Sequence, residues 1–332
     1  MKLIIRKGNS KYELSFDVIT QLCGSNIPLK SFIINSICKH FSSEKYKEYE
    51  EDLIDNVEIG GEVPGRKQWE CYLIASTESI ISAIQMNKGS ILGKCMKEYV
   101  GEFDCQNELV QIDDILLRMF ERLNKTVLLN ESIEIQYTKE DLFDMLLQTS
   151  VRTVDGRDIH VLENAELLNI LLDIINKQQQ LLPEKRLYIF ENIDHLISKD
   201  EYIGFVLRCQ ELTKESNVWF IFSTSLDEYV YLDEATIENV NIINEDVFII
   251  PSLEHLLSFV DENYPVEERW DEGKLIDVMA KLVQKIGRAN EMIQPLELVI
   301  LKLINETNDI KKCWKKSPKT AEIQCLMDEN VI

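Results

Sequence analysis

The sequence contains few of the residues that build metal centres and disulfide scaffolds. Its 332 residues include four histidines and eight cysteines, and no two cysteines form a C-x-x-C pair. A zinc cluster needs cysteine or histidine ligands at short spacing, so none is expected. The scattered cysteines instead indicate reduced thiols in a cytoplasmic compartment.

Long hydrophobic runs are also missing. Two of the longest, residues 187–190 and 218–222, are far shorter than the ~20 apolar residues that a membrane-spanning helix needs. The opening segment, MKLIIRKGNS, lacks the apolar core of a secretory signal peptide. We therefore expect a cytoplasmic protein that does not attach to a membrane.

Positive charge is in short supply. The chain has 36 Lys and Arg against 58 Asp and Glu, a formal net charge of −22. Phosphate contacts need Lys and Arg, so the charge alone argues against nucleic-acid binding and favours an acidic, self-repelling surface. Two other interpretations stay open. Basic groups could gather in one place, or a divalent cation could bridge acidic clusters.

The hydrophobic pattern predicts an α/β protein. Short apolar runs typical of strands alternate with amphipathic runs typical of helices, and one strand–helix–strand succession predicts a βαβ unit. The βαβ unit comprises residues 186–192, 201–215 and 217–225. The other expected strands are 2–6, 12–17, 18–23, 69–76 and a single strand in 239–250, and the first expected helix is 31–41.

The rest of the chain has a mostly helical pattern. Residues 108–125 predict a long amphipathic helix, whose apolar stripe is Leu109, Ile112, Leu116, Met119, Phe120 and Leu123. A strand is expected at 132–138, a loop at 149–160, and further helices at 139–148, 164–182, 253–264, 273–287 and 291–306. We expect a discontinuous head (1–75 and 183–250), a mostly helical insertion (76–182), C-terminal helices (251–310) and a lysine-rich tail (311–332) that lacks fixed structure.

Residues 24–31 have the outline of a phosphate-binding loop between a strand and a helix. The usual G-x-x-x-x-G-K-[ST] pattern becomes Gly24-Ser-Asn-Ile-Pro-Leu-Lys-Ser31, and Asn26 matches the asparagine of the ABC and chromosome-maintenance pattern G-x-N-G-x-G-K-S. Two glycines are missing, because Ile27 and Leu29 occupy their positions. Pro28 also removes a backbone donor from the middle of the loop.

The catalytic groups that should accompany such a loop are altered as well. The second core strand offers Glu191 for a metal, but Asn192 follows it, and an amide cannot act as a general base. Ser225 follows the third strand, where ABC-type ATPases have a histidine. The pattern predicts an ABC/SMC-like, P-loop-derived head with a vestigial nucleotide site and no catalytic residue. Its residues would be Gly24, Asn26, Lys30, Ser31, Glu191, Asn192 and Ser225.

Five segments of the chain, taken together, carry a family resemblance. They are residues 16–37, 64–67, 191–198, 222–225 and 259–265. They are similar to the accessory adaptation protein of type II-A CRISPR systems, in its longer streptococcal-type subfamily. The resemblance implies an ABC-like head that is not an ATPase, with a helical leg inserted in it. It also implies a homotetrameric ring that binds double-stranded DNA at free ends.

The resemblance further implies partners and a cation. The partners are the CRISPR integrase complex and the effector nuclease of the same system, during spacer acquisition, and calcium supports the ring in shorter members. Asp113 and Asp114 are weak calcium candidates, since a pair of acidic residues on an amphipathic helix is more often a solvated face. The candidate DNA contacts are Lys30, Arg66 and Lys67, together with the lysines of 311–319. Alternatively, Lys30 forms a salt bridge with Glu191.

Two other classes of function remain open. An active ABC/AAA-type NTPase with an atypical P-loop would use Glu191 for Mg²⁺, and an interaction scaffold would use its acidic helices without DNA. No catalytic triad stands out. His40 and His195 are interpreted as core or capping residues.

Overall fold

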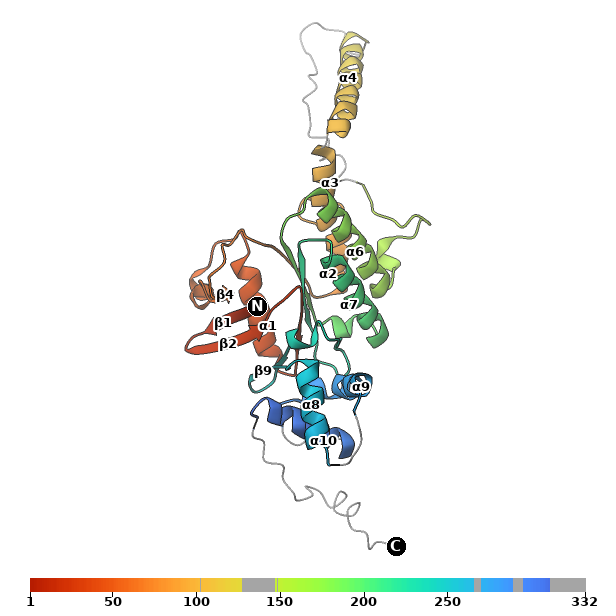
Figure 1. Cartoon of the computed structure of the whole chain (residues 1–332). Coiled ribbons are helices and arrows are strands. Elements are labelled where there is room, and N and C mark those ends of the chain that lie inside the picture. Colours follow the sequence, from red (N-terminus) through yellow and green to blue (C-terminus); the bar gives the residue numbers. More distant parts are fainter. Residues whose placement is uncertain (102, 127–146, 148, 266–269, 289–294, 311–332) are drawn as a thin grey trace. The chain divides into compact units, whose positions relative to one another are not determined.

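The structure is a computed structural model of the whole chain, and it describes residues 1–101, 103–126, 147, 149–265, 270–288 and 295–310 (Figure 1). The expected strand at 132–138, the expected helix at 139–148 except for residue 147, and the lysine-rich tail lie outside the described residues.

The chain folds into two compact units. Unit 1 comprises Met1–Leu73, Leu187–Val206 and the chain from Trp219 onward, and unit 2 comprises Ile74–Arg186 and Leu207–Val218. This division differs from the one expected from sequence in two places. The C-terminal helices group with unit 1, and Leu207–Val218 group with unit 2.

A six-stranded sheet is the centre of unit 1. Its strand order is β5-β6-β7-β3-β8-β9, where β3 runs parallel to β7 and β8, and β9 runs antiparallel to β8. The strands are β3 (Ile19–Cys23), β5 (Glu70–Ile74), β6 (Arg186–Glu191), β7 (Val218–Ser223), β8 (Val240–Ile243) and β9 (Val247–Ile249). The prediction of a single strand in 239–250 is therefore wrong, because two strands, β8 and β9, lie there. The polar residues 244–246 form a tight turn, in which the Asn244 N–H donates to the Asp246 carbonyl at 3.0 Å.

The central strands are mostly apolar because both of their faces are buried. On β6, Leu187 and Ile189 belong to the core around α1 (Ile27–His40). Phe190 faces the other side, where its ring lies 5.1 Å from the ring of Phe205 in α7 and 5.4 Å from that of Phe222 in β7. Strand β6 thus contributes side chains to two cores, one on each face of the sheet.

Helix α1 shares a core with a second, smaller sheet. That sheet is antiparallel, has the order β2-β1-β4, and comprises β1 (Lys2–Lys7), β2 (Ser10–Ser15) and the short β4 (Val57–Ile59), which the sequence pattern did not predict. Ile33 and Ile37 of α1 share one buried cluster with Leu3 of the small sheet and with Leu22 and Ile221 of the large sheet. The helix that follows the glycine loop is therefore held by both sheets.

The C-terminal helices form another core of unit 1. They are α8 (Leu253–Asn263), α9 (Glu272–Leu282) and α10 (Pro295–Thr307). Their buried residues, such as Leu256 and Met279, cluster with Val240 and Ile242 of β8. Short 3₁₀ segments lie at η1 (Glu48–Leu53), η2 (Ile159–Val161), η3 (Ile193–His195), η4 (Ile237–Asn239) and η5 (Val283–Lys285).

Unit 2 is helical in its described part. It contains α2 (Thr77–Ile84), α3 (Ile91–Gly101), α4 (Phe103–Thr126), α6 (Asn164–Leu181) and the C-terminal half of α7 (Lys199–Thr213). The expected stripe of α4 is substantially exposed: Ile112 by 41%, Met119 by 48% and Leu123 by 37%. Among the described helices, none combines the length and the apolar character that crossing a bilayer requires.

Candidate functional site

The loop after β3 turns sharply at Gly24 and enters α1 at Asn26. Gly24 has φ +107°, and a Cβ there would lie 2.3 Å from the carbonyl oxygen of Ile243, so only glycine fits. Asn26 is the N-cap of α1, and its side-chain oxygen accepts from the Leu29 N–H at 3.1 Å. Pro28 lies in the first turn, where a missing N–H costs little.

The first three N–H groups of the loop all donate to distant parts of unit 1. Gly24 donates to the side-chain oxygen of Gln284. Ser25 donates to Asn244 Oδ1 at 2.8 Å, and Asn26 donates to the Ile243 carbonyl at 3.1 Å. These acceptors come from the β8–β9 turn and from η5, more than 200 positions later in the chain.

The remaining donors of the loop are satisfied locally. Ile27 donates to the Ser25 carbonyl at 2.9 Å, and Leu29 and Lys30 donate to the side chain and carbonyl of Asn26, at 3.1 and 3.0 Å. Pro28 has no N–H. A phosphate-binding loop works because its N–H groups point at the ligand, but every N–H from residue 24 to residue 30 already has a protein acceptor.

Two buried side-chain amides hold the loop in this arrangement, and no motif in the sequence pointed to either of them. Asn244 is 3% exposed and Gln284 is 2% exposed. The Asn244 side-chain amide donates to the backbone carbonyls of Gln284 and Ile286, at 3.2 and 2.6 Å, while the Asn244 backbone carbonyl accepts from the Asn26 side chain at 2.8 Å. Because Asn244 is itself fixed on several sides, it presents a rigid acceptor to Ser25.

The Lys30 side chain points into the protein. It is 2% exposed, and its Nζ donates to the Thr224 carbonyl at 2.5 Å and to Ser225 Oγ at 2.7 Å. Burial lowers the pKa of Lys30, and the nearby Cys23, Asp194 and Glu191 oppose that shift. An ammonium in this position does not face a DNA phosphate, so Lys30 is not carried forward as a DNA contact.

Glu191 accepts a hydrogen bond from Ser31, whose Oγ donates to Glu191 Oε1 at 2.7 Å. The ion pair between Lys30 and Glu191 considered from the sequence is not the arrangement found, since Lys30 donates to Thr224 and Ser225. The structure nevertheless brings four of the expected residues together, because the bonds Ser31–Glu191 and Lys30–Ser225 link α1 to the ends of β6 and β7.

Asp194 is a member of the site that the sequence pattern missed. It is 3% exposed, and its Oδ2 accepts from the N–H groups of Ser225 and Leu226 at 2.6 and 2.8 Å. Asn192 makes this possible by taking the left-handed conformation (φ +57°), which turns the chain from β6 into η3. Asp194 therefore fixes the segment that supplies the acceptors for Lys30.

Cys23, at the end of β3, is the nearest thiol to the loop. Burial raises its pKa to about 11, against a smaller opposing effect of the Thr224 hydroxyl, which lies 3.6 Å from its sulfur. A thiol of this kind stays protonated at neutral pH and is a poor nucleophile.

Arg66 caps the C-terminal end of α1. Its guanidinium donates to the carbonyls of His40 at 3.2 Å, Ser42 at 2.5 Å and Glu44, and it lies 4.7 Å from the ring centre of Tyr46. The sequence predicted Arg66 as a DNA contact, whereas in the structure its guanidinium is directed at these backbone carbonyls. The neighbouring Lys67 is exposed.

His40 is a core residue, as the sequence suggested. It is 1% exposed, and its Nε2 lies 2.7 Å from the Pro64 carbonyl.

Asp113 and Asp114 do not form a calcium site by themselves. Both lie on α4, where Asp113 is 6% exposed and Asp114 is exposed. Adjacent residues of a helix point roughly 100° apart, whereas calcium takes about 6–8 converging oxygens. Within the described residues, no group of three or more His, Cys, Asp or Glu could hold a metal ion.

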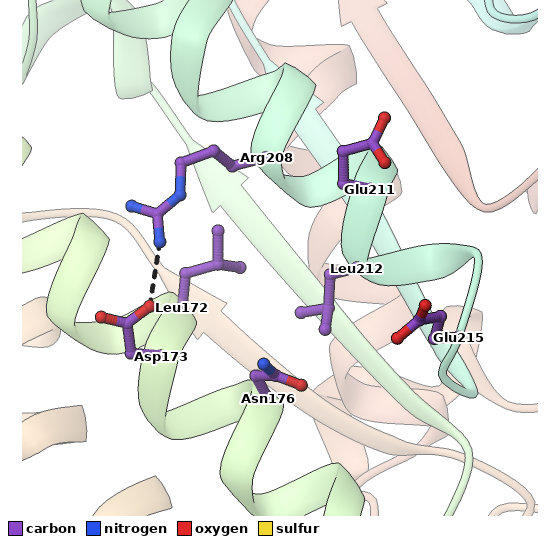
Figure 2. Close-up of a pocket in the computed structure, with 7 residues that line it drawn as sticks. All are labelled: Leu172, Asp173, Asn176, Arg208, Glu211, Leu212 and Glu215. Carbon is purple, nitrogen blue, oxygen red and sulfur yellow. Dashed lines mark hydrogen bonds and ion pairs between the residues drawn. The ribbon is translucent and has the colours of Figure 1, made fainter.

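Unit 2 has a separate hollow of about 310 Å³ between α6 and α7. Figure 2 shows the Arg208 guanidinium directed at Asp173, to which it donates at 2.9 Å. Another acidic residue of the lining, Glu211, pairs with Lys214 at 2.6 Å. Since these charges are already paired, the hollow is a weaker candidate than the loop after β3.

A protein-family model described as "CRISPR-associated protein Csn2 subfamily St" matches residues 6–319. No protein of the curated set has a significantly similar sequence. Among solved structures, Stu0660 of Streptococcus thermophilus is similar to this chain with a TM-score of 0.86 and 20% identity, covering 98% of this chain and 99% of that one. At this identity the likeness shows a shared fold.

Two SMC head structures are similar at a much lower level. The SMC head bound to the C-winged helix domain of ScpA has 16% identity and a TM-score of 0.42, covering 76% of this chain and 98% of that chain. The SMC head bound to the C-terminal domain of ScpA, from Pyrococcus furiosus, has 12% identity and a TM-score of 0.39, covering 79% and 98%. Likeness at this level carries no argument about the head.

Gly24 and Gly61 both have positive φ, but only Gly24 is closely packed, so alanine substitutions at the two positions should differ in their effect on stability. In Gly24→Ala the new methyl group meets the Ile243 backbone, so we expect the free energy of unfolding to fall by about 3 kcal/mol or more. In Gly61→Ala, at φ +90°, no atom lies within 4 Å of the new methyl group, so only the conformational cost of about 1–2 kcal/mol remains. Urea unfolding followed by circular dichroism measures both, and equal losses would contradict the close packing of the loop on β8.

The second prediction concerns the pH dependence of the buried lysine. Because burial lowers the pKa of Lys30 in the folded chain, the unfolded chain binds more protons between that pKa and about 10.4, and stability rises with pH in that window. We expect the unfolding free energy of the wild type, minus that of Lys30→Met, to increase from pH 7 to about pH 10. A difference that stays constant or falls would show that Lys30 is not buried as a charge.

Proposed function

Because this chain belongs to the Csn2 family of CRISPR-associated proteins, subfamily St, we propose that it is a non-enzymatic protein that binds the ends of double-stranded DNA. Family membership gives it a CRISPR-associated, type II-A role. The activity at DNA ends, its place in spacer acquisition and a cytoplasmic location are the further content of the proposal. One observation carries the non-enzymatic part: every N–H of the loop from residue 24 to residue 30 is bonded within the protein.

We infer that the head derives from a P-loop ancestor whose nucleotide site has closed. Support comes from Lys30 and Ser31 at the start of α1, and from Glu191 at the end of β6, which Ser31 reaches. The NTPase alternative would require Lys30 to leave Thr224 and Ser225, and the loop to give up its bonds to Asn244 and Gln284. It would still lack a general base at Asn192.

The proposed DNA contacts lie in the N-terminal part of the chain, where acidic residues barely outnumber basic ones. Residues 1–73 contain ten Lys and Arg and eleven Asp and Glu, so they are nearly neutral in a chain of net charge −22. Lys67 is exposed in this region and is retained as a contact. Contacts of this kind are made to phosphates, so binding would be independent of sequence and sensitive to salt.

The proposed homotetrameric ring needs a surface through which copies associate. Helix α4 offers one, because its apolar stripe, including Ile112, Met119 and Leu123, is exposed. Exposed apolar residues at helical spacing favour burial against a partner, and a second copy of this chain is the occupant that we propose.

The same proposal includes two partners and a cation. The partners are the integrase complex and the effector nuclease of the same CRISPR system. Calcium would stabilise the ring or its DNA complex, with ligands beyond those that Asp113 and Asp114 supply. Native mass with and without Ca²⁺ tests the cation.

A ring that enters DNA at a free end predicts a topological difference in binding. Linear duplex and closed circular plasmid of equal length are loaded at low salt, washed with high salt, and the retained protein is measured. We expect the protein to remain on the linear duplex when its ends are blocked after loading, and to be absent from the circle. Equal retention on both forms would exclude threading over ends.

Two exposed lysines, Lys67 and Lys177, serve as test and matched control for the proposed phosphate contacts. Lys67→Ala is expected to reduce the slope of log affinity against log salt by about 1 for each copy that contacts the duplex, and so by about 4 for a tetramer in which all four copies do. Lys177→Ala, at an exposed lysine of α6, should leave the slope unchanged. Failure of every form to shift any duplex at low salt would favour the interaction-scaffold alternative.

The association surface gives a separate prediction. Ile112→Glu places a charge on the stripe of α4, so we expect native mass spectrometry to show loss of the tetramer with the fold retained, because the residue is 41% exposed in the single chain. Val110→Glu is the matched control, since Val110 is 52% exposed and points roughly 160° away from Ile112 around the helix. Tetramers that survive Ile112→Glu would rule out this face.

A further inference from the structure

Two cysteines of unit 1 lie side by side although they are distant in sequence. Cys38 is in the last turns of α1 and Cys71 is in β5, an edge strand of the six-stranded sheet. Their sulfurs are 3.9 Å apart, and the Cys71 thiol donates to the Cys38 sulfur. Both residues are free thiols and only half-buried, whereas Cys23, Cys95 and Cys209 are buried.

We propose that Cys38 and Cys71 are a redox modification site, which a low-molecular-weight disulfide converts reversibly into an intramolecular disulfide. A disulfide bond is about 2.0 Å long, so the sulfurs must approach by roughly 2 Å. Both side chains pack against the core around α1, so the two sulfurs share one partly buried environment. The proposal does not depend on DNA binding or on the ring.

The hydrogen bond between the two thiols determines which cysteine reacts first with the low-molecular-weight disulfide. It raises the pKa of Cys71 well above the usual value, with burial adding to the effect, so Cys71 keeps its proton longer. The thiolate of Cys38 attacks the disulfide R–S–S–R, forms a mixed disulfide and releases one R–S⁻, which takes up a proton. Cys71 then loses its proton to solvent and attacks the Cys38 sulfur, and the second R–S⁻ leaves.

The net change is balanced. Two protein thiols lose two electrons and two protons, and one low-molecular-weight disulfide becomes two thiols. The reaction runs backward when the thiol pool is reducing, as in an ordinary cytosol, so the pair is a dithiol at rest and a disulfide under oxidative conditions.

The bond would fasten α1 to the edge of the large sheet. The loop that it closes contains η1, β4 and the Arg66 turn that caps α1. Closing a loop of roughly 30 residues restricts the unfolded chain, so the oxidised protein should be the more stable form.

The test equilibrates the full-length protein with mixtures of oxidised and reduced glutathione, blocks free thiols with an alkylating reagent, and maps the peptides by mass spectrometry. We expect a peptide pair joined through Cys38 and Cys71, lost again on dithiothreitol treatment. We also expect the midpoint of thermal unfolding to rise by roughly 5 °C on oxidation. Stable glutathione adducts without the joined pair, or no oxidation at either residue, would overturn the proposal.

Three serine variants make the result specific. Cys71→Ser should stop the reaction at the mixed disulfide on Cys38. Cys38→Ser should take up less glutathione at Cys71, because burial still raises the Cys71 pKa after the bond to Cys38 is lost. Cys209→Ser, at a fully buried thiol in α7, should oxidise as the wild type does. Equal glutathione uptake in Cys38→Ser and Cys71→Ser would contradict the assigned order of attack.

Discussion

The hydrogen bonds that Asn244 and Gln284 make to the loop after β3 are the constraint on which the head depends. Buried N–H groups must have acceptors, and in a nucleotide-binding loop the phosphates provide them. Here two buried amides provide them, so the strand–turn–helix junction is complete without a ligand. Gly24 is still required, but for its approach to the Ile243 backbone.

The same hydrogen bonds make phosphate binding to this loop energetically unfavourable. Each buried donor or acceptor left without a partner costs about 1–3 kcal/mol, and a phosphate would have to displace Asn244 and Gln284 from the loop. It would also have to draw Lys30 away from Thr224 and Ser225, which Asp194 holds in place. These costs add up within one connected network, so the loop of residues 24–30 is stable without a ligand.

The local parts of this arrangement could be predicted from sequence, but its long-range partners could not. The β-branched run before Gly24 and the amphipathic run after Lys30 predicted the strand, the turn and α1, and the apolar run before Glu191 predicted β6. The acceptors from Asn244 and Gln284 have no local pattern, because a buried amide resembles any other polar residue until the fold brings it near. Likewise, the stripe of α4 predicted a helix, but periodicity does not say what covers it.

The positions of the basic residues connect DNA binding to assembly. Of the three candidate contacts within the described residues, Lys30 is buried and Arg66 is occupied by backbone carbonyls, so Lys67 is the one of these that leaves its charge at the surface. A single contact releases about one counterion, which is too little to hold an acidic chain on DNA at physiological salt. If several copies present the same near-neutral region to one duplex, the contacts multiply and their effective concentration rises. The proposed binding therefore requires the proposed ring, and a variant that separates the copies should also lose the duplex.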